Sequence, residues 1–272
     1  STDTTLIRFT TMPVANAGTD INLCQLNATL GAVASVGNGT WTQVAGPGII
    51  NFNDSTSATT SVSTTTEGIY TLQWTEDNGY GCVQSDMVTV TLWNQPNANA
   101  GVLDSICSLS YLLQAQPSYG IGTWSQISGP GFSQIANNHN PTTQATVSMH
   151  GIYQYQWLED NHGCTSSDTV KIIYNYTPTS TFTIQNINCF SDTTLVTFTG
   201  MVDSAVVYNW NFGQANIISG SQGGPYFINY STDGSFSVSL TVSQHGCVSN
   251  PTTVQINNPP LLQLSLQKTD IS

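Results

Sequence analysis

The sequence predicts an all-β chain made of tandem β-sandwich repeats. Apolar and polar residues alternate over short runs, as in half-buried strands, and Gly, Pro, Asn, Ser and Thr interrupt these runs every few residues. The length of 272 residues exceeds that of one ordinary domain, which has about 100 to 200 residues. Landmark residues also recur at a nearly constant spacing, which is the signature of a repeat protein.

Prolines and cysteines fix the length of the repeating unit. Boundary prolines follow one another at steps of 83, 82 and 81 residues: Pro13, Pro96, Pro178 and Pro259. Each unit also has one early and one late cysteine: Cys24 and Cys82, Cys107 and Cys164, Cys189 and Cys247. We therefore expect residues 1–12 to be the last strand of a preceding repeat, 13–94 to be repeat 1, 95–176 repeat 2, 177–258 a divergent repeat 3, and 259–272 the first strand of a following repeat.

Each unit is expected to have about seven short strands, as an immunoglobulin-like sandwich does. In repeat 1, Trp41 lies on the third strand, and Gly68 followed by Tyr70 opens the sixth, which resembles a tyrosine corner. Repeat 2 has closely matching strings around both places. Short joints with proline, such as Asn94 to Asn97, leave little slack, so we expect the sandwiches to stack end to end as a rod, each adding roughly 35 Å.

The composition excludes several classes of partner. Three basic residues stand against 15 acidic ones, giving a net charge of -12 and no basic patch for nucleic acid or anionic lipid. No unbroken apolar stretch is long enough to span a membrane, and no secretory signal opens the chain. We expect any export signal or anchor to lie outside this piece.

The cysteine spacing favours disulfide bonds within each unit: Cys24 with Cys82, Cys107 with Cys164, and Cys189 with Cys247. Each bond would staple one end of its own sandwich, and a closed loop of about 60 residues contributes roughly 4 kcal/mol in the chain-entropy model. Disulfides persist outside the cytosol, so they predict an extracellular location. The alternative is three pairs of free thiols, which mass measurement before and after reduction would distinguish.

Several strings carry a resemblance to a known family: the unit openings PVANAGTD and PNANAG, the pair GTWTQVAGPG and GTWSQISGPG, and the endings EDNGYGC and EDNHGC. Over nearly the whole chain, the sequence resembles the polycystic-kidney-disease-like (PKD-like) repeats of secreted surface proteins, especially giant adhesins of Bacteroidota exported by type IX secretion. Tyr208 to Gln214 is similar to the family string YxWDFGDG, although Asn211 replaces its Asp. The resemblance implies a stalk or filament module at the cell surface, in which identical chains can also assemble into fibres.

Calcium is the only cofactor for which the sequence offers candidates. Glu76 and Asp77, repeated as Glu159 and Asp160, place hard oxygen ligands at a hairpin turn. The alternative is a solvated turn in which Asp and Asn bond the local backbone, and the Gly-rich context favours it. No spaced calcium loop is present.

Nothing in the sequence predicts catalysis. The four histidines are scattered without converging partners, and no GxSxG, HExxH, GxGxxG or phosphate-loop string occurs, so we expect no enzyme activity. Five tryptophans have fixed places in strands, which favours core packing over sugar stacking: Trp41, Trp74, Trp124, Trp157 and Trp210. Trp93 differs, since repeats 2 and 3 lack it, and is expected to buttress the junction between units.

Surface modification is also expected. Asp-Ser/Thr strings similar to the Bacteroidota O-glycosylation signal contain six hydroxyls: Thr4, Ser55, Ser105, Thr169, Thr193 and Ser204. The alternative is chance in a chain rich in Ser and Thr, and Thr169 is expected on a strand where it could be inaccessible. An intact mass above the sequence value would support glycosylation.

Two functions of different class remain open. A spacer or stalk of a surface adhesin or filament needs small polar loops, whereas an adhesive module that recognises a glycan or protein partner needs exposed aromatic loop residues such as Tyr80, Tyr119 or Tyr226. Burial of all three tyrosines would eliminate the binding module in this form.

Overall fold

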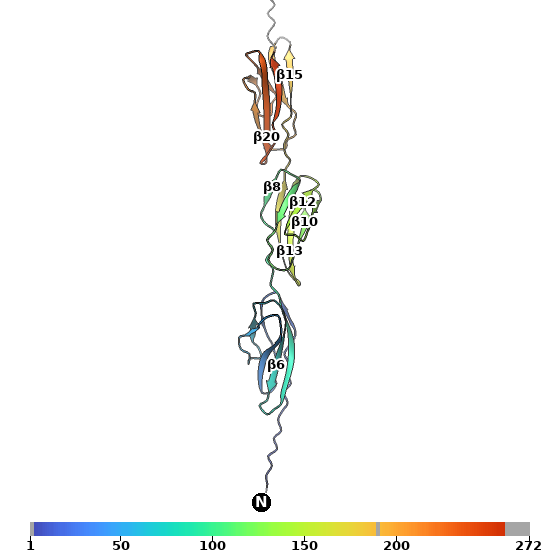
Figure 1. Ribbon diagram of the computed structural model, residues 1–272, viewed down its shortest axis with the longest axis vertical. Helices are drawn as coiled ribbons and strands as arrows, with labels where there is room; N and C mark the ends of the chain where they lie inside the picture. The colour runs from blue at the N-terminus through green and yellow to red at the C-terminus, as the bar shows by residue number, and fades with distance from the viewer. Residues whose placement is uncertain (1–2, 189–190, 259–272) are drawn as a thin grey trace, which may run out of the picture.

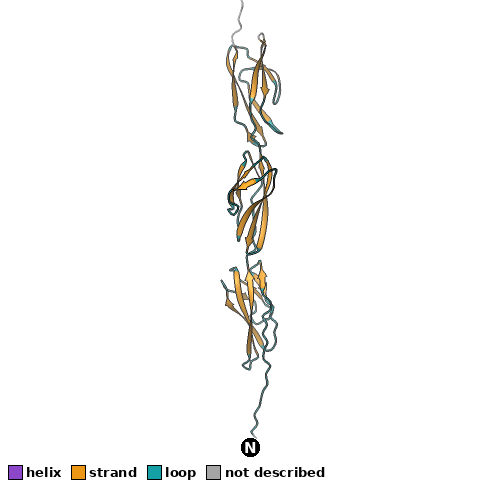
Figure 2. Cartoon of the chain, turned by 90° about the vertical axis from the view of Figure 1, so that its right-hand side faces the viewer, coloured by secondary structure: helices purple, strands orange, loops and turns teal. Residues whose placement is uncertain are grey.

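The computed structural model describes residues 3–188 and 191–258, and all regular structure within them is β-strand. Three sandwiches follow one another along a single axis and form a rod (Figure 1). A second view, turned by a quarter, shows the same end-to-end stacking (Figure 2). The predicted tandem all-β architecture is therefore confirmed. Residues 259–272, expected to begin a following repeat, lie outside the described residues.

Repeat 1 folds into a four-stranded and a three-stranded sheet, with orders β1-β7-β6-β3 and β2-β5-β4. The strands are β1 (Ile21–Leu23), β2 (Asn27–Thr29), β3 (Asn38–Ala45), β4 (Asn51–Phe52), β5 (Ser61–Ser63), β6 (Gly68–Asp77) and β7 (Val83–Leu92). The alternating apolar positions of the two sheets face each other and form one hydrophobic cluster.

Repeat 2 repeats this plan, with sheets of order β10-β13-β14-β8 and β11-β12-β9. Its strands are β8 (Asp104–Ile106), β9 (Ser110–Gln114), β10 (Ile121–Ser128), β11 (Ser133–Ile135), β12 (Thr142–Val147), β13 (Gly151–Asn161) and β14 (Cys164–Tyr174). A second separate hydrophobic cluster lies between these sheets.

Repeat 3 differs in its sheets, as its sequence divergence suggests. One sheet has the order β15-β16-β19-β18, and in the other β20 pairs with β17, β21 and β22. The strands are β15 (Phe182–Asn188), β16 (Ser191–Phe198), β17 (Val207–Asn211), β18 (Asn216–Ser219), β19 (Tyr226–Asn229), β20 (Gly234–Gln244), β21 (Cys247–Val248) and β22 (Thr252–Asn258). Its hydrophobic cluster is again its own.

Parallel pairing of the first and last strands sets the geometry of repeats 1 and 2. β1 runs parallel to β7, with Leu23 opposite Leu92, and β8 runs parallel to β14, with Ile106 opposite Tyr174. The first strand of each unit therefore ends where the last strand ends, at the exit end of the sandwich. The hairpin that begins the last strand lies at the opposite, entry end.

Tryptophan pairs fill the centres of repeats 1 and 2. Trp41 and Trp74 have ring centroids 5.3 Å apart, and each side chain is 1% exposed. A Cβ on Gly39 would lie 1.8 Å from the Trp74 ring, so this position of the GTW string must be glycine. Repeat 2 has the same arrangement, which confirms core packing for these four tryptophans. Trp210 of repeat 3 is half-buried and stacks on Phe212.

The predicted tyrosine corner is confirmed. The Tyr70 hydroxyl donates to the Thr66 carbonyl at 2.6 Å, and the Tyr153 hydroxyl donates to the Met149 carbonyl at 3.0 Å. Both tyrosines are fully buried. The hydrogen bond fixes the loop before the sixth strand against the core.

Candidate functional site: the junctions between repeats

Two disulfide bonds cross from one sandwich to the next. Cys24 of repeat 1 is bonded to Cys164 of repeat 2, and Cys107 of repeat 2 is bonded to Cys247 of repeat 3, each over a sequence separation of 140 residues. The Cα atoms of each pair are 5.5 Å apart, an ordinary separation for a disulfide. Each bond joins the exit end of one unit to the entry end of the following unit.

The predicted bonds within each unit are wrong, and strand direction explains why. Cys24 follows β1 at the exit end of repeat 1, whereas Cys82 precedes β7 at the entry end. A ten-residue strand separates those ends by roughly 33 Å, far beyond the reach of a disulfide. Cys107 and Cys164 are separated in the same way.

The remaining two cysteines have different outcomes. Cys82 is a free, half-buried thiol. Cys189 lies outside the described residues, and because Cys247 is bonded to Cys107, the predicted pair of Cys189 with Cys247 is wrong as well.

Stacking and hydrogen bonds complete the first junction, between repeats 1 and 2. The rings of Trp93 and His162 stack with centroids 3.7 Å apart and an interplanar angle of 4°. This confirms that Trp93 buttresses the junction. The Asn161 side chain, 3% exposed, donates to the Asn94 carbonyl and to Glu67 Oε2, both at 2.9 Å.

Glu67 organises the linker at this junction. Its carboxylate accepts hydrogen bonds from the backbone and side-chain nitrogens of Asn94, both at 3.0 Å, and from the Asn161 side chain. The pKa of Glu67 is lowered, chiefly by the backbone hydrogen bond from Asn94 and then by the bond from Asn161. These donors favour the ionised carboxylate.

The second junction, between repeats 2 and 3, uses equivalent positions with other residues. His150, at the place of Glu67, packs on Tyr176, at the place of Asn94, with centroids 3.9 Å apart. Gln244, at the place of Asn161, is 3% exposed and donates to the Tyr176 carbonyl at 3.4 Å. Both junctions therefore hold the linker carbonyl with a buried side-chain amide next to the disulfide.

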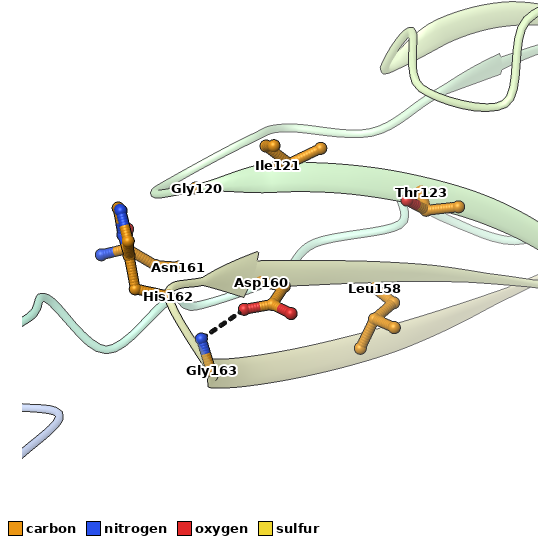
Figure 3. Close-up of a pocket in the computed structure, with 8 residues that line it drawn as sticks. All are labelled: Gly120, Ile121, Thr123, Leu158, Asp160, Asn161, His162 and Gly163. Carbon is orange, nitrogen blue, oxygen red and sulfur yellow. Dashed lines mark hydrogen bonds between the residues drawn. The ribbon is translucent and has the colours of Figure 1, made fainter.

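A surface pocket of about 510 Å³ lies beside the first junction. Figure 3 shows its lining, in which Asp160, His162 and Gly163 come from the hairpin between β13 and β14. Asp160 Oδ1 accepts the Gly163 backbone N–H at 2.6 Å, and the His162 ring is engaged by Trp93. The polar groups of this pocket thus shape the hairpin that docks on repeat 1.

The two glutamates that were weak calcium candidates, Glu76 and Glu159, lie inside their sandwiches rather than in the hairpin turn. Both are 1% exposed and point into their own sandwiches. Glu76 accepts Trp74 Nε1–H at 2.9 Å and also the Ser35 hydroxyl and backbone N–H; Glu159 is held in the same way. Burial raises the pKa of Glu76, but these hydrogen bonds outweigh it and leave the pKa lowered.

The predicted aspartates do not join these glutamates as ligands. Asp77 accepts the Gly79 backbone N–H at 2.8 Å, the turn role that was the alternative to calcium, and Asp160 behaves in the same way. Over residues 3–188 and 191–258, no three His, Cys, Asp or Glu side chains are grouped to hold a metal ion. The same residues contain no helix able to span a bilayer.

Four predicted glycosylation hydroxyls are exposed, namely those of Thr4, Ser105, Thr169 and Ser204. Ser55 and Thr193 are half-buried. The concern that Thr169 is inaccessible is therefore wrong, because its side chain faces solvent from β14. Modification of the six residues stays a prediction.

Apart from Trp93, sequence reasoning missed the side chains that hold the linkers at the junctions. Glu67 and His150 occupy one position in neighbouring repeats, but their side chains differ, so self-similarity does not mark them. Asn161 does match Asn78 one repeat earlier, but its contact with the linker was not predicted. Ser35, which anchors Glu76, was also missed, although Ser118 matches it one repeat later. That match was the available signal.

A comparison with solved structures finds other chains built from tandem domains. No family model and no curated protein matches the chain. A three-immunoglobulin-domain structure of titin is 11% identical with a TM-score of 0.44, covering 87% of this chain and 96% of that chain. Extracellular domains 3–5 of Drosophila OTK are 11% identical with a TM-score of 0.35, covering 89% and 95%. Domains EC22–24 of mouse cadherin-23 are 12% identical with a TM-score of 0.28, covering 90% and 98%. Such low values establish neither a shared family nor a shared function.

Proposed function

We propose that the chain is a structural spacer of a large secreted cell-surface adhesin or extracellular filament, to which it gives reach and stiffness. The observation that carries this proposal is the pair of disulfide bonds across the junctions. A bond within a sandwich stabilises that sandwich alone, whereas a bond across a junction restrains bending and separation of two sandwiches. Disulfides also indicate an oxidising, extracellular location.

Buried contacts beside each bond support the same role. At the first junction the linker carbonyl of Asn94 and the carboxylate of Glu67 share the buried amide of Asn161. A linker held on both sides has little freedom to move. The linker and the disulfide are therefore two separate attachments between neighbouring sandwiches. A single attachment lets one sandwich rotate about it as a hinge, whereas two attachments restrain that rotation.

The resemblance to PKD-like repeats supports the finer part of the proposal. It favours a Bacteroidota surface protein exported by type IX secretion, with neighbouring repeats of the same chain and identical chains of a fibre as partners. O-glycosylation at the exposed hydroxyls fits such a surface. An intact mass above that of the sequence tests this modification.

An adhesive module that recognises a glycan or protein through sandwich-end loops is the second candidate. Tyr80 and Tyr119 are 56% and 48% exposed, whereas Tyr226 is 9% exposed, so the predicted tyrosines are not all buried. The guanidinium of Arg8, however, lies over the Tyr80 ring, 3.9 Å from its centroid. This contact favours a junction role for Tyr80.

Deletion of residues 95–176 from the full-length parent protein separates the two functions. The deletion removes one repeat and leaves Cys24 of repeat 1 at the junction with Cys247 of repeat 3, so the bonding pattern can be kept. A spacer predicts shorter rods in electron microscopy and retained adhesion. Loss of adhesion with normally folded, shorter rods would contradict the spacer and favour the binding module.

A further inference from the structure

The entry end of repeat 1 has the same parts as the two bonded junctions. Residues 3–12 continue along the rod axis beyond the first sandwich (Figures 1 and 2). Asn78 Nδ2 donates to the Thr11 carbonyl at 2.8 Å, as Asn161 donates to the Asn94 carbonyl and Gln244 to the Tyr176 carbonyl. The segment around Thr11 is therefore held on repeat 1 by the same kind of hydrogen bond that holds the linkers at the two junctions.

Cys82 stands where the other two junctions have their disulfide cysteine. It follows the turn after the long strand β6, as Cys164 follows β13 and Cys247 follows β20, and Cys164 and Cys247 are both bonded to the preceding repeat. Those two are 3% and 0% exposed, whereas Cys82 is only half-buried. Thr10 Oγ1 approaches the Cys82 sulfur to 3.8 Å, so the seated segment passes beside the thiol.

The segment before Thr10 has the side chains of a last strand without a sandwich around them. Ile7 and Phe9 correspond, one repeat earlier, to Val90 and Leu92 of β7. Val90 and Leu92 are each 0% exposed in the core of repeat 1, but Ile7 is 72% and Phe9 94% exposed. Alternate apolar side chains of this kind fit the open side of an immunoglobulin-like sandwich that lacks its last strand.

From these three observations we infer that this end is a covalent acceptor for one more repeat of the same kind. Residues 5–10 complete its sheet, the Asn78 amide holds its linker, and Cys82 bonds to the cysteine that follows its first strand. The inference depends on one part of the proposed function, namely that the rod continues with a further repeat before residue 5. The two thiols lose two protons and two electrons as the S–S bond forms, and a low-molecular-weight disulfide accepts them and is cleaved to two thiols.

A fused chain tests the inference. A copy of residues 13–87 is placed directly before Thr5, so that residues 5–10 stand at the register of the missing last strand. After refolding with oxidised glutathione, peptide mapping should show that Cys82 of repeat 1 is bonded to Cys24 of the copy. Alkylation of Cys82 of repeat 1 should then be lost. A copy with Cys24→Ser should restore that alkylation.

Two further variants test the strand itself. Phe9→Asp in the fused chain should abolish the new bond, because a charge would enter the core of the added sandwich. Leu6→Thr is the matched control, since the corresponding residue of β7 is Thr89, and it should leave the bond intact. Equal bonding in both variants would overturn the role of the strand.

The outcomes separate this inference from the spacer proposal. If Cys82 stays open to alkylation, or links two chains through Cys82 itself, while Cys24–Cys164 and Cys107–Cys247 form, the acceptor is overturned and the spacer is not. Peptide mapping of the native parent protein provides a second measurement that needs no engineered fold. There, any partner of Cys82 other than the early cysteine of the preceding repeat would overturn the inference.

Discussion

Unfolding of the middle repeat should hardly lengthen the rod while both disulfides are intact. Cys164 ties the start of β14 to repeat 1, and the chain from Cys164 to Tyr176 then leads straight to repeat 3. Tension transmitted between the outer repeats therefore passes along the last strand of repeat 2. Its other strands lie in a loop that the disulfide bypasses.

The magnitude follows from strand geometry. In the fold, β14 spans 11 residues and roughly 36 Å, and the fully extended route from Cys164 to Tyr176 is only about 42 Å long. Without the bonds, a repeat of about 82 residues extends to roughly 290 Å, a gain of about 250 Å over its folded length. The bonds should thus reduce the step for repeat 2 from about 250 Å to less than about 10 Å.

Single-molecule force spectroscopy, with the chain held at its two ends, measures this directly. In the oxidised chain the first two repeats to unfold should give no step near 250 Å, because the bonds bypass a repeat that unfolds while another repeat stays folded. Only the last repeat to unfold should release one large step, of at most about 250 Å. The reduced chain, and the double variant Cys24→Ser with Cys107→Ser, should show three such steps. More than one step of about 250 Å in the oxidised chain, with both bonds verified by mapping, would refute this account of the junctions.

Three further predictions concern single side chains. Glu76→Gln should lower the free energy of unfolding of repeat 1 by about 1.5 to 3 kcal/mol in denaturant melts, because a buried charged acceptor is lost; an unchanged midpoint would count against the buried network. Glu67 has a lowered pKa, so its contribution to the stability of the junction is present above the ordinary pKa of 4.5 and is lost as the pH falls through the pKa of the folded state. Small-angle scattering of the reduced chain should therefore show more bending between repeats 1 and 2 at low pH. Glu67→Gln should remove most of that pH dependence. Trp93→Ala should speed reduction of the Cys24–Cys164 bond relative to Cys107–Cys247, and equal rates in variant and wild type would contradict a buttressing role.

Much of the fold could be predicted because the residues that pack the core recur in each repeat. The GTW strings locate the tryptophan pairs, since Gly39 must be small for the Trp74 ring to lie against β3. The Gly-x-Tyr strings locate the tyrosine corners, since a Cβ on Gly68 or Gly151 would lie 2.7 Å from Pro47 or Pro130. These are local requirements of each sandwich, so they recur in sequence wherever the sandwich recurs.

The disulfide pairing could not be predicted from the same spacing, because a register of early and late cysteines fits bonds within a unit and bonds between units equally well. The deciding fact is the parallel pairing of β1 with β7, and a strand of three residues leaves little trace in the sequence. One physical clue was available. A chain that enters one end of a sandwich and leaves at the other runs along its first and last strands in the same direction, which puts Cys24 and Cys82 at opposite ends.

The staggered pairing has a consequence for the whole array that bonds within each unit would not have. An interior repeat such as repeat 2 contributes its late cysteine to the unit before it and its early cysteine to the unit after it, so it is anchored at both ends. An isolated sandwich of about 80 residues has only a few kcal/mol of stability, and stretching would soon unfold it. With both ends anchored, the rod keeps its length when the core of such a repeat opens. The core can then refold between neighbours that have not moved, so the reach of the rod does not depend on every sandwich staying folded.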